Sequence, residues 1–211
     1  MPNLLTLAIT ESDPKSEKYK IVAMDIGTSI FYDMDLKLDE ITKDNKRLWD
    51  IGGVSYAEEL KITYDYNQNY IYHPEGNIKF VKNYSRPELK KIITNNCVNL
   101  KTFYEEDIKH AIVKIDYLDD LQPPFYDSDN VLKSYIKVTA QGYTPIKGIL
   151  NKDYRWLNYW KHIYDQQRVN EKIGYFKNLI NDSVEQDTFL IMYKHNYKRG
   201  SGRWIEGFHW L

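Results

Sequence analysis

The stretch that decides the fold is Ile30–Leu38, Ile-Phe-Tyr-Asp-Met-Asp-Leu-Lys-Leu, in which apolar and polar residues alternate over most of its length. Side chains of a β-strand point in turn to opposite faces of the sheet, so this pattern predicts a strand with one buried and one solvated face. Strands of an all-parallel sheet would be apolar on both faces, which makes an antiparallel sheet the better prediction. Further strand-like runs occur at Leu4–Ile9, Tyr19–Ile26, Leu60–Tyr66, Tyr70–Tyr72, Ile78–Val81 and Val131–Ala140.

The longest helical signal lies at Asp153–Ile180, where apolar residues recur at the spacing of one helix face. Thr188–Tyr197 and Trp204–Leu211 then predict a terminal β-hairpin around a basic turn. We therefore expect an α+β fold with a mainly antiparallel sheet. Whether this sheet forms a partly closed barrel is not decided by the sequence. The long helix of the C-terminal half is expected to pack on this sheet.

Shorter signals complete the predicted element order. Ser85 followed by Pro87 and Glu88 predicts a helix start, because serine caps, proline suits the first turn and glutamate completes a capping box. Another short helix is expected at Asp39–Trp49, and His73–Asn77 is expected to be a turn. Residues 105–118 fit the helix and strand periods in part, so their structure is left open.

A single domain over residues 1–211 is expected, because a chain of this length can be organised around one core. The most conspicuous loop signal is residues 121–130, which contain Pro123-Pro124 and the polar run Asp127–Asn130. Any boundary between subdomains is expected there.

The charge balance argues against a large basic surface. The chain has 29 Lys and Arg residues against 30 Asp and Glu residues, and its formal net charge is −1. Binding to nucleic acid or to an anionic membrane draws on surplus positive potential, so we expect no membrane partner and do not favour nucleic acid. The sequence shows no signal peptide and no apolar stretch long enough to cross a bilayer. We predict that the protein is located in the cytoplasm of a bacterium or host cell, and the virion stays as an alternative location.

The single cysteine, Cys97, cannot form a disulfide within the chain. It follows the run Ile92–Asn96, and no basic cluster surrounds it to lower its pKa. A buried, unreactive thiol is therefore predicted.

Aromatic residues are the most unusual part of the composition, with 19 Tyr, 7 Phe and 5 Trp. Tyrosine combines an apolar ring with a polar hydroxyl, and Tyr and Trp are enriched where proteins touch. Other protein chains, in a homo- or hetero-oligomer, are therefore the expected partners. The residues chosen as interface candidates are Trp204, Phe208, Trp210 and Tyr197.

One motif resembles a known family. Ile21–Ser29, Ile-Val-Ala-Met-Asp-Ile-Gly-Thr-Ser, resembles the first phosphate-binding motif of the superfamily of actin, sugar kinases and heat-shock ATPases. The resemblance implies that Asp25, Gly27, Thr28 and Ser29 contact a nucleotide. The same residues suit a simple hairpin turn, which is the interpretation we prefer.

Acidic residues supply an enzymatic alternative. Asp25, Asp33 and Asp35 are the residues that a metal-dependent phosphoesterase or a nucleotide-binding enzyme would use to hold a divalent cation. The five histidines show no zinc-ligand spacing, and no Walker, Rossmann or nucleophile-elbow motif occurs. No catalytic residue, metal or cofactor is therefore predicted, and whether the protein is an enzyme stays open, with a non-enzyme preferred.

The turn of the terminal hairpin supplies a second alternative. Lys198, Arg199 and Arg203 lie among aromatic residues, a mixture that suits phosphate contacts and base stacking. A nucleic-acid-binding accessory protein is the corresponding hypothesis. The leading hypothesis remains a non-enzymatic protein-interaction protein, either a structural or assembly component of a phage or related particle, or a small inhibitor or immunity factor.

Overall fold

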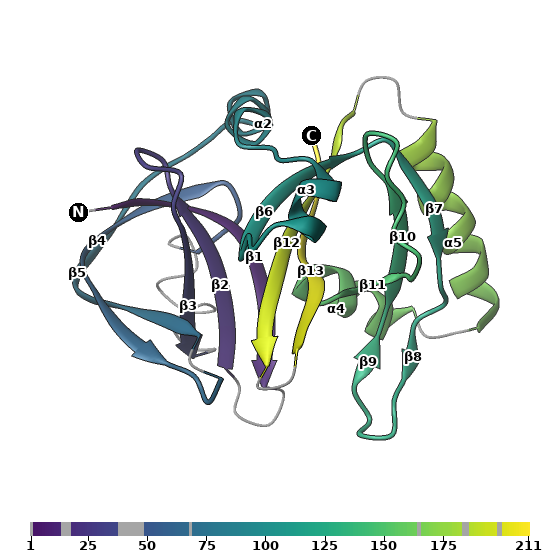
Figure 1. Cartoon of the computed structure of the whole chain (residues 1–211), viewed down its shortest axis with the longest axis horizontal. Helices are drawn as coiled ribbons and strands as arrows, with labels where there is room; N and C mark the ends of the chain where they lie inside the picture. Colours follow the sequence, from purple (N-terminus) through teal and green to yellow (C-terminus); the bar gives the residue numbers. More distant parts are fainter. Residues whose placement is uncertain are drawn as a thin grey trace. The chain divides into compact units, whose positions relative to one another are not determined.

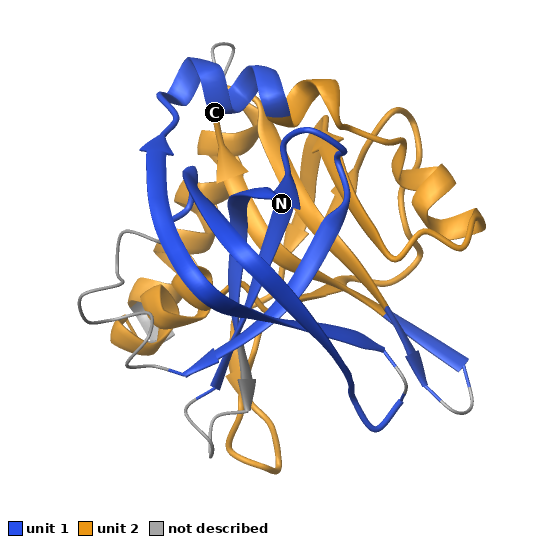
Figure 2. Ribbon diagram, turned by 90° about the vertical axis from the view of Figure 1, so that its left-hand side faces the viewer, with its two compact units in different colours: residues 1–92, 195–202 blue, residues 93–194, 203–211 orange. Residues whose placement is uncertain are grey.

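A computed structural model describes residues 2–13, 18–37, 49–67, 69–163, 166–182, 186–197 and 200–211. Over this described part the chain is mostly β, with 53% in strands and 21% in helices, and it forms three sheets and four short helices. The chain divides into two compact units (Figure 2). The first comprises residues 1–92 and 195–202, and the second comprises residues 93–194 and 203–211.

The first unit is a closed barrel of five strands, in the order β1-β2-β3-β5-β4 (Figure 1). Neighbouring strands are antiparallel except β3 and β5, which are parallel. The strands are β1 (Asn3–Asp13), β2 (Lys18–Asp25), β3 (Phe31–Lys37), β4 (Gly53–Tyr64) and β5 (Tyr70–Asn83). Helix α2 (Arg86–Asn95) follows β5.

Strand β1 closes the barrel because it pairs on both of its edges. It runs along β2 over most of its length, and Asn3–Leu5 also pair with Val54–Tyr56 of β4. A register shift between Thr6 and Ala8 marks a β-bulge, a device that bends a strand and increases its twist. The barrel core contains Leu4, Ile21, Ala23, Met34, Leu36, Trp49 and Ala57.

The second unit contains a six-stranded sheet in the order β6-β12-β13-β11-β10-β7. Its strands are β6 (His110–Ile115), β7 (Tyr117–Leu121), β10 (Tyr135–Thr139), β11 (Ile149–Asn151), β12 (Thr188–Tyr197) and β13 (Gly200–Trp210). The outer ends of β12 and β13 belong to the first unit. A separate two-stranded sheet is formed by β8 (Phe125–Tyr126) and β9 (Leu132–Lys133).

Three helices accompany this sheet: α3 (Leu100–Glu105), α4 (Tyr154–His162) and α5 (Gln166–Asn181). Helix α4 begins at Asp153, whose carboxylate accepts the backbone N–H groups of Arg155 and Trp156. Trp156 and Trp160 of α4, with Val169 and Ile180 of α5, join the core that also contains Ile136, Val138 and Phe208. The helices therefore share one core with the sheet.

Both units follow the same strand order. Strands β6 and β7 are separated only by Asp116, so the two edge strands of the second sheet are one stretch of chain. If this stretch is counted as a first strand, β10, β11, β12 and β13 take the places of β2, β3, β4 and β5. The parallel pair β11–β13 then corresponds to the parallel pair β3–β5. This is the strand order of the OB-fold, a five-stranded barrel that is often only partly closed.

The predicted α+β fold was wrong, because the part of the chain that the structure describes is mostly β and contains no long helix packed on a sheet. The apolar stripe in Asp153–Ile180 is real, but two helices share it. Helix α4 ends at Ile163, whose N–H bonds to the carbonyl oxygen of Trp160, and α5 begins at Gln166. The spacing of apolar residues indicates which face of a helix is buried, but it does not show whether one helix runs through the whole segment.

Other predicted elements fared differently. The helix start at Ser85 is confirmed, since α2 begins at Arg86 and the Ser85 backbone N–H and hydroxyl both donate to the Glu88 carboxylate. Residues 110–115, in the segment left open, form strand β6. The helix expected at Asp39–Trp49 lies almost wholly outside the described residues. The 121–130 segment lies inside the second unit, and the single-domain organisation stays a prediction.

Candidate nucleic-acid interface

A groove in the second unit is built on the alternation of strand β10. Ile136 and Val138 are fully buried in the core, which turns Tyr135, Lys137 and Thr139 to the opposite face of the strand. These three side chains are only partly buried. Strand β10 therefore offers an aromatic ring and an ammonium group, two residues apart, on its outer face.

Strand β7 forms one wall of the groove. It runs antiparallel to β10, and its register places Asp120 opposite Lys137 and Leu121 opposite Ile136. Leu118 and Leu121 are buried, whereas Asp120 is exposed and lines the groove. The Asp120 carboxylate also lies 3.8 Å from the ammonium of Lys177 on helix α5.

The β8–β9 hairpin forms a second wall and places Phe125 beside Tyr135. The two rings are nearly parallel, with centroids 6.2 Å apart and an angle of 11° between their planes. Phe125 remains 44% exposed. The pair therefore presents aromatic faces on which another planar ring can stack.

Asp127 shapes the tip of this hairpin. Its Oδ1 accepts the backbone N–H groups of Asp129 and Val131 at 3.0 and 2.9 Å, and its Oδ2 lies 3.2 Å from Lys133 Nζ. The hydrogen bond from Val131, with the bonds from Lys133 and Asp129, holds the pKa of this carboxyl below its ordinary value. A charged Asp127 thus stabilises the turn that carries Phe125.

The segment before β11 completes the groove. Ile146 is 94% exposed, Lys147 follows it, and Gly148 lies against the base of Tyr135. A Cβ on Gly148 would lie 3.3 Å from Tyr135 Cβ, so glycine allows a close approach of the two chains at this point.

The groove encloses about 510 Å³. Its chemistry combines aromatic faces, two ammonium groups, an amide and a carboxylate. No described residue forms an ion pair with Lys137 or Lys147 within 4 Å. The residues that line it are Asp120, Gln122, Phe125, Tyr135, Lys137, Ile146, Lys147 and Gly148.

The interface candidates chosen from the sequence lie mostly in the interior of the second unit. Phe208 is buried in the core, and its ring stacks on Trp156 at 5.5 Å. Trp210 packs on the same core, and Trp204 is buried beside Tyr193. Tyr197 is the exception, since half of its surface is exposed.

The nucleic-acid candidates of the terminal hairpin give a divided result. Lys198 and Arg199 lie outside the described residues. The Arg203 guanidinium donates to the Tyr104 carbonyl oxygen at 2.9 Å and lies 5.0 Å from the centroid of that ring. Burial, with the nearby Tyr143, raises the pKa of the Tyr104 hydroxyl to about 12. Arg203 thus contacts helix α3.

The three aspartates considered as ligands of a divalent cation lie in strands β2 and β3 of the first barrel. Asp25 ends β2 and accepts hydrogen bonds from the Thr28 hydroxyl at 2.7 Å and from the backbone N–H groups of Asn3 and Gly27. The segment resembling a phosphate-binding motif is thus the turn of the β2–β3 hairpin. Asp33 pairs with Lys20 at 3.4 Å. Burial raises the pKa of the Asp35 carboxyl, although His73 and two lysines act against this shift.

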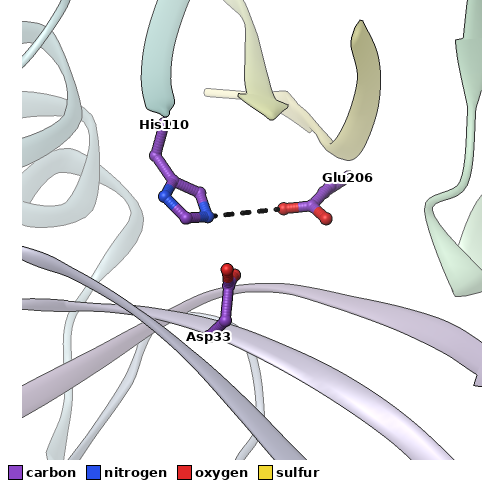
Figure 3. A group of neighbouring side chains, drawn as sticks. All are labelled: Asp33, His110 and Glu206. Atoms are coloured by element: carbon purple, nitrogen blue, oxygen red, sulfur yellow. Dashed lines mark ion pairs between the residues drawn. The ribbon is translucent and has the colours of Figure 1, made fainter. Parts of the chain in front are cut away.

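Histidine and carboxylate also meet within the sheet of the second unit. His110 Nε2 on β6 lies 3.9 Å from Glu206 Oε2 on β13, and both side chains are buried (Figure 3). The other carboxylate oxygen accepts the indole N–H of Trp204 at 3.2 Å. Burying a polar group costs free energy unless the group is hydrogen-bonded, and the Trp204 indole supplies one such bond to Glu206.

Sequence reasoning missed the groove residues, although two signals pointed toward them. The alternation of Val131–Ala140 places Tyr135 and Lys137 on the same face, and residues 121–130 carry the most conspicuous loop signal of the sequence. No local pattern shows that this loop folds back as a hairpin against β10, because the contact of Phe125 with Tyr135 depends on tertiary structure.

Comparisons with known proteins add the following findings. No protein-family model matches the sequence, and no curated protein matches it. Among solved structures, the chain is similar to the tetrameric p202 HIN2 (TM-score 0.40, 8% identity, 100% of this chain and 93% of that chain). It is also similar to a Replication Protein A heterotrimer bound to ssDNA (TM-score 0.41, 10% identity, 100% of this chain and 47% of that chain). None of the described helices is both long and apolar enough to cross a membrane.

Proposed function

We propose that the protein binds single-stranded nucleic acid in the groove of its second unit. The single observation that carries the proposal is the near-parallel pair Phe125 and Tyr135, with Lys137 and Lys147 in the same groove. Stacking on aromatic rings requires bases that are not stacked within a duplex, which is why the proposal is for a single strand.

The place of the groove in the fold supports the same function. OB-folds bind oligonucleotides on the face of their second and third strands and on neighbouring loops. In the second unit β10 takes the place of the second strand, and the β8–β9 hairpin lies in the connection between the first and second strands. The groove occupies this region of the fold.

The charges set the expected strength of binding. Lys137 and Lys147 supply two phosphate contacts, while Asp120 contributes a negative charge to the groove. The whole chain has a net charge of −1, so long-range attraction of a polyanion is weak. We expect most of the affinity to come from stacking, worth about 1–3 kcal/mol per base.

Fluorescence anisotropy with a labelled oligothymidylate of about 15 nucleotides tests the proposal, since OB-folds cover about 4–16 nucleotides. Phe125→Ala removes one stacking surface, so we expect binding about 5–150 times weaker. Lys137→Glu with Lys147→Glu should weaken binding further and reduce the slope of log K against log salt by about 0.7 for each lysine.

Matched controls separate the groove from general surface effects. Tyr175 is an exposed aromatic residue of helix α5 outside the groove lining, and Tyr175→Ala should leave binding unchanged. Lys91→Glu with Lys172→Glu removes the same charge from exposed helical positions. The proposal fails if wild-type protein binds no oligonucleotide, or if the control pair weakens binding as much as the groove pair.

Other hypotheses from the sequence have less support. No comparison supports a phage structural component, and Asp25 and Asp33 have local partners in the first barrel. Docking of another polypeptide is supported by a different surface, in the first unit.

A further inference from the structure

The far end of the β4–β5 pair is a distinct surface of the first unit. We call residues Glu59–Tyr64 of β4 with Tyr70–Glu75 of β5 the β4–β5 arm. Strand β4 pairs with β1 only at Val54–Tyr56, so within the described part of the chain Glu59–Tyr64 pair with β5 alone. The other edge of this segment of β4 is therefore open, and its backbone groups can hydrogen-bond to an added strand.

One face of the arm is apolar. The register places Ile62 opposite Tyr72 and Tyr64 opposite Tyr70, and the last two rings lie 5.2 Å apart. Ile62 is 50% exposed and Tyr64 is 63% exposed, and Tyr66 in the adjoining turn is 82% exposed. Contiguous exposed apolar residues of this kind mark interaction sites.

The opposite face of the arm is acidic. Glu59 lies directly opposite Glu75, an arrangement of like charges that is unfavourable across a strand pair. Lys61 lies 3.5 Å from Glu75 and balances one of the two charges. The arm itself has two acidic side chains and one lysine, a formal net charge of −1 with histidine neutral, and the adjoining Glu58 and Asp65 bring residues 58–75 to −3. A phosphate backbone is repelled by such a surface.

We propose that the arm binds an extended, basic polypeptide segment that adds as a strand to the open edge of β4. Alternate residues of an added strand point to opposite faces. Apolar residues of the partner cover Ile62 and Tyr64, and its Lys or Arg residues lie beside Glu59 on the other face. The partner's charge relieves the repulsion between Glu59 and Glu75, and the backbone ladder supplies the affinity.

Two capped heptapeptides provide the first test, one alternating valine with lysine and one alternating valine with glutamate. Isothermal titration calorimetry of the full chain should give about tenfold tighter binding of the lysine peptide, or more, at low salt. Glu59→Lys with Glu75→Lys should reverse this preference. Glu59→Gln with Glu75→Gln keeps the shape of both side chains and should abolish the preference without favouring the glutamate peptide.

Backbone methylation tests the strand geometry. Only every second N–H of an added strand points to the edge of β4, so N-methylation of one alternate set in the lysine peptide should abolish binding. Methylation of the other set should leave binding intact. As a control, Glu171→Lys with Asp182→Lys changes two exposed acidic positions outside the arm and should leave the preference unchanged.

Three outcomes would overturn the proposal. Equal affinity for the two peptides would show that the acidic residues of the arm do not select a basic partner. Binding that survives both methylation patterns would show that the peptide does not add as a strand to β4. Self-association in light scattering that Ile62→Lys abolishes would show that a second copy of the chain occupies the arm instead. None of these outcomes bears on oligonucleotide binding by the second unit, because no residue of the arm lines the groove.

Discussion

Asp153 Oδ2 accepts the backbone N–H of Phe208 at 2.8 Å, so the carboxylate that caps helix α4 also fixes strand β13. The other oxygen, Oδ1, accepts the N–H groups of Arg155 and Trp156 at 2.8 and 3.3 Å. The side chain is almost completely buried. One residue thus joins the start of a helix to the sheet that the helix covers.

Asp153→Ala is expected to lower the free energy of unfolding by about 2–4 kcal/mol, because it removes a helix cap and leaves the buried N–H of Phe208 without its acceptor. Urea denaturation followed by circular dichroism measures the change. Asp182→Ala, at an exposed position after α5, is the control and should cost less than about 0.5 kcal/mol. Equal effects of the two substitutions would contradict this role of Asp153.

Ser134 and Trp156 are expected to be energetically coupled. The Trp156 indole N–H donates to Ser134 Oγ at 2.9 Å, and both side chains are buried. Ser134→Ala leaves that N–H without an acceptor and should cost about 1–3 kcal/mol. In a Trp156→Phe background the same change should cost almost nothing, because no indole N–H remains. Denaturation of the wild type, the two single variants and the double variant gives the coupling energy, and additive costs would rule it out.

Cys97 is expected to react slowly with alkylating reagents. Burial raises the pKa of its thiol to about 11, and the thiol donates to the Ile93 carbonyl oxygen at 3.3 Å. Only the thiolate reacts, so at pH 8 about one molecule in a thousand is reactive. The rate of reaction with iodoacetamide should keep rising with pH beyond 10, whereas a rate that is half-maximal near pH 9 and level above about pH 10 would show an ordinary thiol.

The same shift predicts how Cys97 affects stability. Between the ordinary pKa of 9.0 and about 11, the unfolded thiol loses its proton while the folded thiol retains it. The folded state then binds more protons, so the free energy of unfolding contributed by this group falls as pH rises through that window. Cys97→Ala should remove this part of the pH dependence in denaturation between pH 9 and 11.

Asp127 is expected to act on the groove through the hairpin that carries Phe125. Asp127→Ala removes the acceptor for the N–H groups of Asp129 and Val131, so oligonucleotide affinity should fall a few-fold with little change in global stability. In the wild type the lowered pKa keeps Asp127 charged well below neutral pH. Its contribution to the stability of the hairpin turn is therefore lost only as pH falls below 3.8, the ordinary pKa of an aspartate. Unchanged affinity in Asp127→Ala would show that the turn does not position Phe125.

Local patterns predicted several strands well. The alternation in Ile30–Leu38 corresponds to β3 at Phe31–Lys37, and Tyr19–Ile26 corresponds to β2 at Lys18–Asp25. The turn expected at His73–Asn77 was wrong, because these residues lie within β5. A register shift between Ala57 and Glu59 accommodates them, with Gly76 at φ +73° and the Asn77 N–H bonded to the Glu58 carboxylate. Turn-forming residues can therefore lie in a bulge inside a strand pair.

Features that depend on distant contacts were beyond local patterns. Nothing near Asp116 in the sequence indicates that β6 and β7 lie on opposite edges of one sheet, because that follows from pairing with β12 and β10. The abundance of aromatic residues suggested Trp204 and Phe208 as interface residues, whereas both side chains are buried in the interior of the second unit. Composition gives the number of aromatic rings, but their exposure to solvent depends on the tertiary structure.

The duplicated strand order has a consequence for how this molecule can be engineered. The connection between the first two strands of the barrel spans residues 14–17, whereas the corresponding connection in the second unit spans residues 122–134 and contains the β8–β9 hairpin. Under the proposed function, oligonucleotide binding by the second unit therefore depends on this longer connection, which carries Phe125. Replacing residues 123–131 with a four-residue link, which keeps the buried Leu132 and Ser134, should abolish oligonucleotide binding while the six-stranded sheet remains folded.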